Sequence, residues 1–250
     1  MNFIGVDLTP ITASAYEPTA FCVLKKDGKG LPVLAECMSV PERDGKASRL
    51  WAEAYAPGVG SGERLDLVGR FVTRADEELV SLIIEFMPGI VAFDTPLSIP
   101  DGRAGYDLRL ADRILTQDPQ LRDFRKTLRA RATLTGRTCR ALAIRELLDR
   151  EGLVYGEDFI EVCPQSSLVY LSLPAEFKDG RMIREDLPDK LLRQLRIPPE
   201  TRLPQNGREY AALVSAFTGY LRYIGVTEEV GDPGEGTITL ARRADHAGSH

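Results

Sequence analysis

Histidine is almost absent from this sequence of 250 residues. The only two, His246 and His250, lie within the last five residues of the chain. A Ser-His-Asp or Cys-His mechanism needs a histidine held in a folded site, and zinc sites commonly use the same side chain. The composition therefore argues against these classes of enzyme and metal site. Any catalysis by this chain has to depend on carboxylates, with help from Lys, Arg or Tyr.

Cysteine is scarce as well, and long apolar runs are lacking. The four cysteines form no CxxC pair, which predicts reduced thiols and a cytoplasmic protein. Cys22 and Cys37 could face each other across a hairpin, but two separate core residues are the preferred interpretation. The first twenty residues do not show the pattern of a signal peptide. The most apolar window, residues 79–93, is interrupted by Glu85 and Pro88, so we expect no membrane-spanning segment.

Three acidic residues each stand where a short apolar run ends. They are Asp7 after Phe-Ile-Gly-Val, Asp94 after Ile-Val-Ala-Phe, and Glu161 after Asp-Phe-Ile. A buried strand that delivers a carboxylate at its end costs desolvation energy unless another group compensates the charge. Three such strands in one sheet would bring the carboxylates together, which is the usual arrangement for Mg²⁺ or Mn²⁺. The sequence thus predicts a metal site formed by these three residues.

Each of these residues also has a purely structural interpretation. Asp7 could cap the following turn through Thr9, and Asp94 could form an Asx-turn with Thr95 and Pro96. Glu161 could be paired with a nearby arginine in a salt bridge.

The order of predicted elements indicates an α/β fold. Apolar periodicity and turn residues predict strands at 1–8, 19–24, 31–37, 90–93, 158–163 and 237–240, and helices at 65–86, 104–117, 119–130, 136–151 and 207–224. Three strands with a hairpin, followed by strands that alternate with helices, correspond to the mixed sheet of the ribonuclease H-like architecture. We expect one such domain over residues 1–243, with a helical insertion around 101–152 and a disordered tail at 244–250.

Several of these segments resemble domain-of-unknown-function family 429, whose members are predicted nucleases with a ribonuclease H-like fold. The matching segments are 3–8, 91–100, 103–109, 160–164, 213–218 and 231–238. The resemblance spans nearly the whole chain. It implies a divalent-metal-dependent nuclease with Asp7, Asp94 and Glu161 as catalytic metal ligands and Mg²⁺ or Mn²⁺ as the cofactor.

One position departs from the family. Members usually carry an Asp at the head of the last helix, where this chain has Ala211. The loss of one carboxylate should weaken binding of Mg²⁺. Glu209 and Asp107 are the possible substitutes, although Glu209 lies about half a helical turn from position 211.

The remaining candidates concern the substrate. Arg103, Asp107, Thr9 and Thr95 could contact a phosphate near the metal. The segment from Arg122 to Arg150 holds nine Lys or Arg residues against three acidic ones, although the whole chain has a formal net charge of −5. Such a segment is compatible with nucleic acid as the partner. The alternative is a pair of solvated helical faces whose Arg stems pack on the surface.

A metal-dependent nuclease is therefore the first functional hypothesis. The second is a catalytically inactive ribonuclease H-like binding or scaffold protein, which Ala211 favours. A distant third is a phosphotransferase of the sugar-kinase or actin-like type, because residues 5–9 (Gly-Val-Asp-Leu-Thr) resemble its first phosphate-contacting strand. No second phosphate hairpin or adenosine-binding segment accompanies it in the sequence.

Overall fold

The computed structural model describes residues 1–9, 19–40, 74–98, 108–132, 136–173 and 189–242. They contain a five-stranded sheet of order β3-β2-β1-β4-β5. Its strands are β1 (Asn2–Asp7), β2 (Thr19–Lys26), β3 (Pro32–Val40), β4 (Pro88–Phe93) and β5 (Phe159–Glu161). The first three strands pair antiparallel, and β4 and β5 continue the sheet parallel to β1. This mixed sheet of order 3-2-1-4-5 is the ribonuclease H-like arrangement, so the predicted fold class is confirmed.

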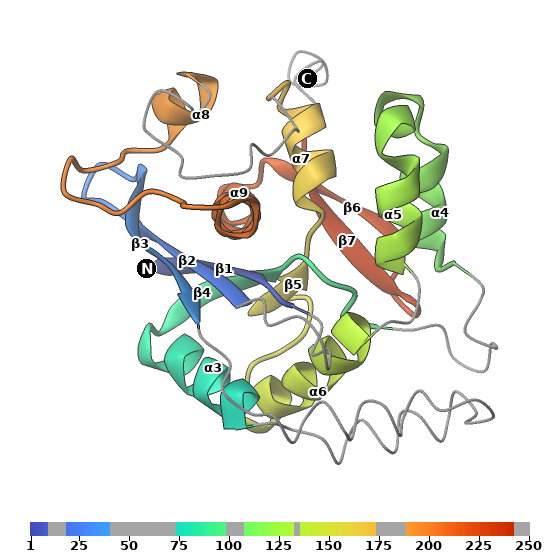
Figure 1. Ribbon diagram of the computed structural model, residues 1–250, viewed down its shortest axis with the longest axis horizontal. Coiled ribbons are helices and arrows are strands. Elements are labelled where there is room, and N and C mark those ends of the chain that lie inside the picture. The colour runs from blue at the N-terminus through green and yellow to red at the C-terminus, as the bar shows by residue number, and fades with distance from the viewer. Residues whose placement is uncertain (10–18, 41–73, 99–107, 133–135, 174–188, 243–250) are drawn as a thin grey trace.

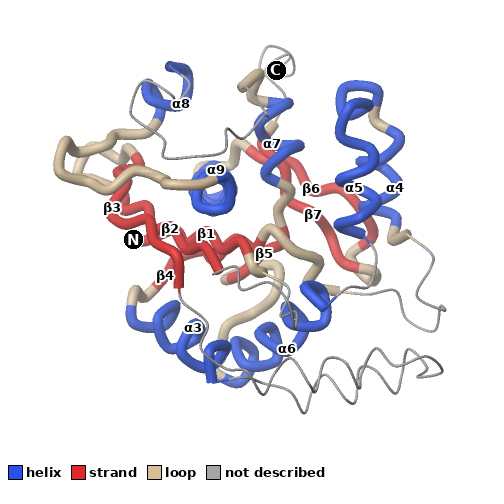
Figure 2. The backbone as a smooth tube through the Cα atoms, viewed as in Figure 1, coloured by secondary structure: helices blue, strands red, loops and turns tan. Residues whose placement is uncertain are grey.

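Helices cover both faces of the sheet (Figure 1). Helix α9 (Gly207–Tyr223) packs on one face, and α3 (Arg74–Glu85) and α6 (Gly136–Arg150) pack on the other. The side chains of β1 alternate accordingly, with Phe3 in the cluster under α9, and Ile4 and Val6 in the cluster under α3 and α6. The tube view shows the same layers, with the sheet edge-on between its helices (Figure 2).

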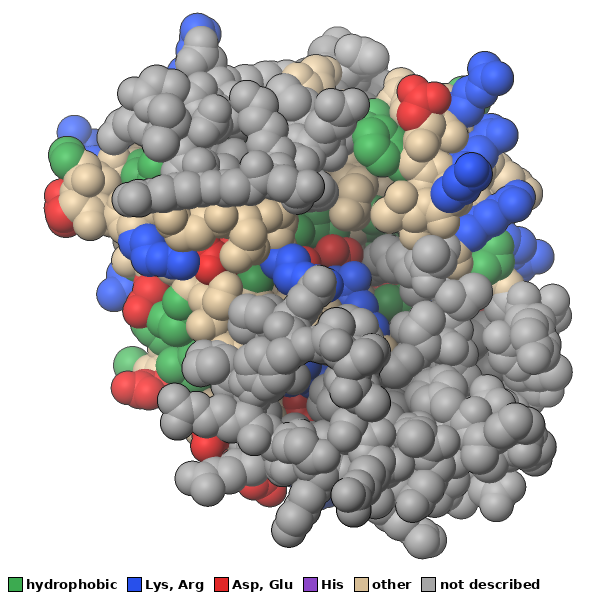
Figure 3. All heavy atoms as spheres, viewed as in Figure 1, with side chains coloured by type: hydrophobic (Ala, Val, Ile, Leu, Met, Phe, Trp, Pro, Cys, Tyr) green, Lys and Arg blue, Asp and Glu red, His purple; other side chains and the backbone are tan. Residues whose placement is uncertain are grey.

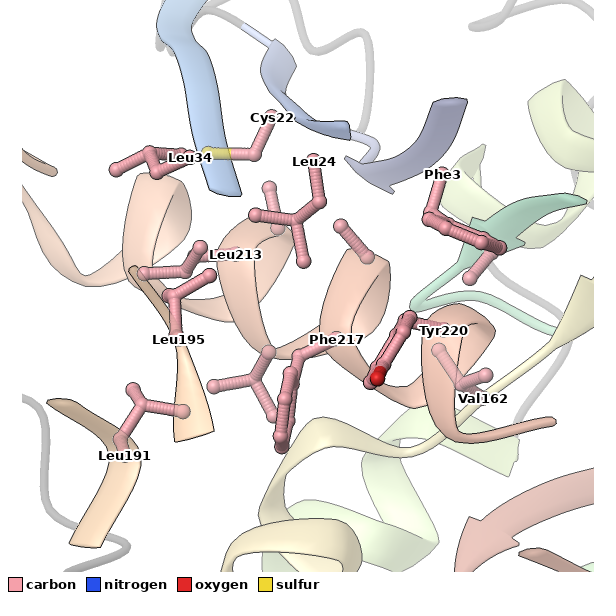
Figure 4. Packing of buried hydrophobic residues seen from close by; sticks show 14 of the residues in the cluster. Phe3, Cys22, Leu24, Leu34, Val162, Leu191, Leu195, Leu213, Phe217 and Tyr220 are labelled. Carbon is pink, nitrogen blue, oxygen red and sulfur yellow. The ribbon is translucent and has the colours of Figure 1, made fainter. Parts of the chain in front are cut away.

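The layer between α9 and the sheet is dense and largely apolar. Figure 4 shows Phe3 and Leu24 of the sheet in one buried cluster with Leu213, Phe217 and Tyr220 of α9. The ring of Phe3 meets that of Tyr220 edge-on, with 5.5 Å between centroids. This contact fixes α9 across β1, β2 and β4.

Gly5 lets the backbones of α9 and β1 touch. A Cβ atom at position 5 would lie 1.8 Å from the carbonyl oxygen of Ala212 and 2.4 Å from the amide nitrogen of Ala216. The glycine that precedes Asp7 is therefore explained by helix packing. The close approach also sets the position of the first turn of α9 relative to the end of β1.

A further apolar cluster joins the elements outside the main sheet. It contains side chains of α4 (Leu110–Gln117), the 3₁₀ helix η1 (Pro119–Phe124), α5 (Arg125–Ala132), α7 (Pro164–Tyr170) and the hairpin β6 (Thr227–Asp232)–β7 (Gly236–Ala241). Thus α4, η1 and α5 belong to this outer cluster, whereas α6 covers the main sheet. A short helix α8 (Asp189–Gln194) packs against the α9 side through Leu191.

Both edges of the sheet carry an additional backbone contact. On the β3 edge, Arg196 forms a bridge with Val33, and its N–H and C=O bond to Pro32 and Leu34 at 2.9 Å. On the β5 edge, Val162 forms a bridge with Thr239 of β7. Short segments of backbone therefore cover part of each outer strand.

Cys22 and Cys37 occupy directly opposed positions on β2 and β3 and form a disulfide. The expectation of separate thiols was wrong for this pair, because the hairpin register places the two residues across from each other. Cys163 is buried and not disulfide-bonded, and its Sγ accepts a hydrogen bond from the hydroxyl of Ser166 at 3.2 Å. None of the helices in the described ranges is both long and apolar enough to cross a membrane.

Candidate active site

Asp7 and Asp94 lie side by side at the carboxyl ends of β1 and β4. Val6 pairs with Phe93 in the parallel register, and the amide of Asp94 donates to the carbonyl of Val6 at 2.9 Å. The next residue on each strand is a carboxylate, and the two side chains are only 7 % and 4 % exposed. Two buried negative charges this close repel each other, so nearby cations are needed to stabilise them.

Arg137 and Arg208 supply compensating charge. Nη2 of Arg137 donates to Oδ1 of Asp7 and to the carbonyl of Asp94, and lies 3.4 Å from Oδ2 of Asp94. Nη1 of Arg208 lies 3.6 Å from Oδ1 of Asp7. Arg137 is the second residue of α6 and Arg208 the second residue of α9. The amino-terminal ends of two helices, which carry partial positive charge, therefore lie beside the carboxylate pair.

Glu161 does not join this pair. In the register of β4 and β5 it stands opposite Phe93, one position before Asp94. Side chains at successive positions leave a strand on opposite faces, so this offset turns Glu161 away from the other two carboxylates. Its carboxylate accepts hydrogen bonds from both terminal nitrogens of Arg109, at 2.6 and 2.7 Å, and from the amide of Leu97 at 3.0 Å. The salt bridge considered as its structural interpretation is present.

Arg109 is the centre of a buried charged cluster. Besides Glu161 it binds both carboxylate oxygens of Asp112, at 2.8 and 3.2 Å, and the hydroxyl of Ser98 at 2.8 Å. Burial disfavours the charged guanidinium, but Glu161 and then Asp112 raise the pKa of Arg109 above its ordinary value, so it stays charged. This cluster ties the end of β5 to the start of α4.

Thr9 and Thr95 are completely buried and hydrogen-bonded within the protein. The hydroxyl of Thr9 lies 3.3 Å from that of Thr19 and 3.4 Å from Nη1 of Arg140. The hydroxyl of Thr95 donates to the carbonyl of Asp94 at 2.5 Å. Arg140 in turn holds Asp76 of α3 at 2.6 Å, with both side chains 1 % exposed. These contacts support the strand ends beneath the carboxylate pair. Arg103 and Asp107 lie outside the described residues.

Ala211 is the fifth residue of α9 and is buried. It follows Arg208 by three residues, and residues at this spacing share one face of a helix. An aspartate there would therefore lie on the same face as the arginine that contacts Asp7. Glu209 does not substitute for it, because its carboxylate binds the guanidinium of Arg202 at 2.8 and 2.9 Å and the hydroxyl of Ser39 at 2.6 Å.

Comparison with solved structures finds two chains of RuvC from Thermus thermophilus. The free RuvC structure aligns with a TM-score of 0.44 at 12 % identity, and RuvC in complex with a Holliday junction substrate aligns with a TM-score of 0.41 at 12 % identity. Each alignment covers 90 % of this chain and 97 % of the RuvC chain. No protein-family model and no curated protein matches the sequence. The fold assignment rests on strand order and direction.

The site provides two metal-ligand candidates where the sequence predicts three. Among the described residues, no group of three or more His, Cys, Asp or Glu side chains is placed to hold a metal ion. Asp7 and Asp94 nevertheless fit a hard divalent cation, since their buried anionic oxygens already share one cationic group, Arg137. Glu161 does not fit, because Arg109 and a backbone amide occupy its oxygens.

The arginines were the residues that sequence reasoning missed. Arg137 and Arg140 were included only as members of a basic segment, and Arg109 and Arg208 were not candidates at all. The sequence offered one signal for them, the charge balance of the predicted site. Three buried carboxylates require buried cations if no metal is bound. Which arginine meets which carboxylate depends on where α6 and α9 begin in space.

Proposed function

We propose that this protein is a divalent-metal-dependent nuclease in which Asp7 and Asp94 hold the metal ion. The observation that carries the proposal is the pair of adjacent buried carboxylates at the carboxyl ends of β1 and β4, on a ribonuclease H-like sheet. We include in this proposal the relationship to family 429 inferred from the motifs around Asp7 and Asp94. We assign Glu161 a structural role, on account of its contacts with Arg109 and Leu97.

The bound ion would be Mg²⁺ or Mn²⁺, and it would supply an activated water and charge stabilisation for hydrolysis of a phosphodiester. The chain's own contribution is the orientation of the substrate. Positive charge lies next to the carboxylates, from the guanidinium of Arg208 and the amino-terminal ends of α6 and α9. These groups would stabilise a phosphate group of the substrate. Ala211 leaves the ligand set short of one carboxylate, so we expect metal affinity to be modest.

A second surface suits the backbone of a nucleic acid. Five basic side chains on α4, η1 and α5 are exposed: Arg113, Arg122, Arg125, Lys126 and Arg129. We call this set the α5 basic face. None of the five forms an ion pair with a residue in the described ranges. Figure 3 shows basic side chains gathered over the region of α4 and α5.

Four further arginines of the basic segment have other partners. Arg140 is buried against Asp76, Arg145 and Arg150 pair with acidic residues one turn away on α6, and Arg137 contacts the carboxylates. The predicted nucleic-acid contact therefore narrows to the α5 basic face. Because each phosphate contact releases counterions, binding there should weaken as salt rises.

A non-catalytic scaffold protein is the second candidate. The observation that favours it is the set of contacts that already neutralise the carboxylates, namely Arg137 on Asp7 and Asp94 and Arg109 on Glu161. A protein that had lost metal binding would keep such pairs because they stabilise the buried charges without a metal.

Calorimetric titration with Mn²⁺ separates the two candidates. We expect wild type to bind Mn²⁺ and Asp94→Asn to lose most of this affinity, whereas Asp123→Asn, on the exposed side of η1, should bind as wild type does. In parallel, cleavage of single- and double-stranded DNA and RNA is measured with and without a chelator. Metal binding with chelator-sensitive cleavage supports the nuclease. Absence of binding at millimolar Mn²⁺ in wild type would overturn it in favour of the scaffold.

The role of the α5 basic face is tested by binding alone. The double variant Arg125→Ala/Lys126→Ala should bind non-specific DNA more weakly and reduce the salt slope by about 2, roughly 1 for each lost phosphate contact. Arg150→Ala is the matched control, because Arg150 is exposed but lies on α6 and pairs with Glu146. An unchanged salt slope in the double variant would rule out the α5 basic face as a contact surface for nucleic-acid phosphates.

A further inference from the structure

We propose that Arg137 occupies the cation site of Asp7 and Asp94 in the absence of metal, and that a divalent ion displaces its guanidinium, which then binds a phosphate of the substrate. This inference rests on the proposed function, since it assumes that the two carboxylates bind a metal. It assigns Arg137 two alternative positions and makes it a substrate-positioning residue that acts only in the metal-bound protein.

The first observation is that the hydrogen bonds of the Arg137 guanidinium are unevenly distributed among its nitrogens. Its Nη2 serves three oxygen atoms, one from Asp7 and two from Asp94. Its Nε is buried and has no hydrogen-bond partner among the described residues. A buried donor without a partner is costly, so this position satisfies the carboxylates better than it satisfies the arginine.

Arg109 provides an internal comparison. Each of its three guanidinium nitrogens donates to at least one oxygen, and its side chain is 3 % exposed. The side chain of Arg137 is 25 % exposed and starts in the first turn of α6. Arg109 is thus fixed by complete pairing, whereas Arg137 can turn toward solvent with the loss of contacts from one nitrogen.

The second observation concerns the charges that remain when Arg137 leaves. Asp7 keeps the 3.6 Å contact with Arg208, but both carboxylates lose the cation that they share. Two adjacent buried carboxylates then have one positive charge fewer beside them. A divalent ion restores the balance, and it binds oxygen ligands of this kind.

A displaced guanidinium has the donors that a phosphate requires. Nε and a terminal nitrogen form a planar fork that matches two oxygens of a phosphate group, and Arg is preferred for such bidentate contacts. The unused Nε–H of Arg137 would gain a partner in this second position. In the metal-free protein the carboxylates hold Nη2, so the guanidinium reaches substrate only after metal has bound.

The apparent affinity for metal depends on how often Arg137 occupies the site between Asp7 and Asp94. When the competent state is only a fraction of the population, the apparent dissociation constant rises by the inverse of that fraction. If Arg137 occupies the carboxylates for about 90 % of the time, its removal should increase the apparent affinity for Mn²⁺ about tenfold. An arginine that only stabilised the fold would not produce this gain.

The experiment is a calorimetric titration of Mn²⁺ into wild type, Arg137→Ala, Arg137→Gln, Arg208→Ala and Asp94→Asn, with thermal unfolding of each protein with and without Mn²⁺. We expect Arg137→Ala and Arg137→Gln to bind Mn²⁺ about tenfold more tightly than wild type and to be less stable without metal. Saturating Mn²⁺ should raise their unfolding temperature more than it raises that of wild type. Arg208→Ala removes a cation that lies 3.6 Å from Oδ1 of Asp7, farther away than the hydrogen-bonded Arg137, so its gain in affinity should be smaller.

Each outcome decides a separate point. Equal or weaker Mn²⁺ affinity in the Arg137 variants, with binding that Asp94→Asn still abolishes, overturns the competition and leaves the proposed function standing. Equal gains in the Arg137 and Arg208 variants would mean that only the local charge matters, and would also overturn it. Absence of binding in every protein would reject both the competition and the proposed function.

The phosphate contact is tested with a short single-stranded oligonucleotide, using Ca²⁺ as the divalent ion to limit cleavage. Arg137→Ala should lower its affinity about tenfold in the presence of Ca²⁺, the value expected for a hydrogen bond to a charged group, and leave the affinity unchanged in chelator. The same loss under both conditions would show that Arg137 contacts nucleic acid without being released by metal, which contradicts the proposal.

Discussion

Replacement of Gly5 by alanine should separate α9 from the sheet. The added Cβ would lie 1.8 Å from the carbonyl oxygen of Ala212 and 2.4 Å from the amide nitrogen of Ala216. Both atoms belong to the backbone of a buried helix, so no side-chain rotation can relieve the clash. Helix α9 would have to move by roughly 1 Å or more to regain ordinary contact distances.

The cost can be estimated from overpacked cores. Inserting a methyl group into a well-packed interior costs about 1–3 kcal/mol, and the backbone contact places Gly5→Ala near the upper value, about 3 kcal/mol. For a chain of this length that loss lowers the midpoint of thermal unfolding by roughly 6–12 °C. The displacement would also move Arg208, at the start of α9, relative to Asp7.

Thermal and urea unfolding of Gly5→Ala and Gly28→Ala provide the assay. Gly28 lies in the turn between β2 and β3, and a Cβ built there meets no atom within 4 Å. We expect Gly28→Ala to change the free energy of unfolding by about 0.5 kcal/mol or less. If Gly5→Ala were as stable as Gly28→Ala, the close approach of α9 to β1 would be wrong.

Three further predictions concern buried polar groups. Glu161→Gln should lower the free energy of unfolding by about 3 kcal/mol, because Arg109 loses a buried anionic partner, yet leave Mn²⁺ affinity unchanged; a loss of Mn²⁺ binding would make Glu161 a ligand after all. Arg140→Met should cost about 3–5 kcal/mol in urea unfolding, because it leaves Asp76 buried without this cation, and a change below about 1 kcal/mol would contradict the pairing. Burial raises the pKa of Tyr210 to about 12, so the folded protein keeps a phenolic proton that the unfolded chain releases near pH 10. Stability should therefore be unaffected by this group below about pH 10 and fall as the pH rises from 10 toward 12, and ultraviolet titration should show at least one tyrosine that ionises only above pH 11.

The fold was predictable because its signals are local. The apolar run of β1, the hairpin between β2 and β3 and the periodicity of α9 each depend on side chains that are near one another in the sequence. Three elements were not predicted: β6, α7 and the six-residue helix α8. Strand β6 (Thr-Glu-Glu-Val-Gly-Asp) is polar and pairs with β7 outside the main sheet, and α7 begins at Pro164, directly after the strand predicted at 158–163.

The site was predictable in part. Apolar runs identified Asp7 and Asp94 as strand-end carboxylates, and the parallel register brings them together. The same pattern selected Glu161, but a strand of three residues conveys no register, and an offset of one position decides on which face its side chain lies. The pairing of Arg109 with Glu161 links residues 52 positions apart, so it depends on tertiary structure alone.

The backbone bridges at the two sheet edges should limit aggregation of this protein through its outer strands. An outer strand with free N–H and C=O groups is a template for another strand, and this is a route to aggregation. Arg196 takes up the hydrogen-bonding groups of Pro32 and Leu34 at the start of β3, and Thr239 of β7 lies against Val162 just after β5. At both places a foreign strand would have to displace the protein's own chain before it could add to the sheet.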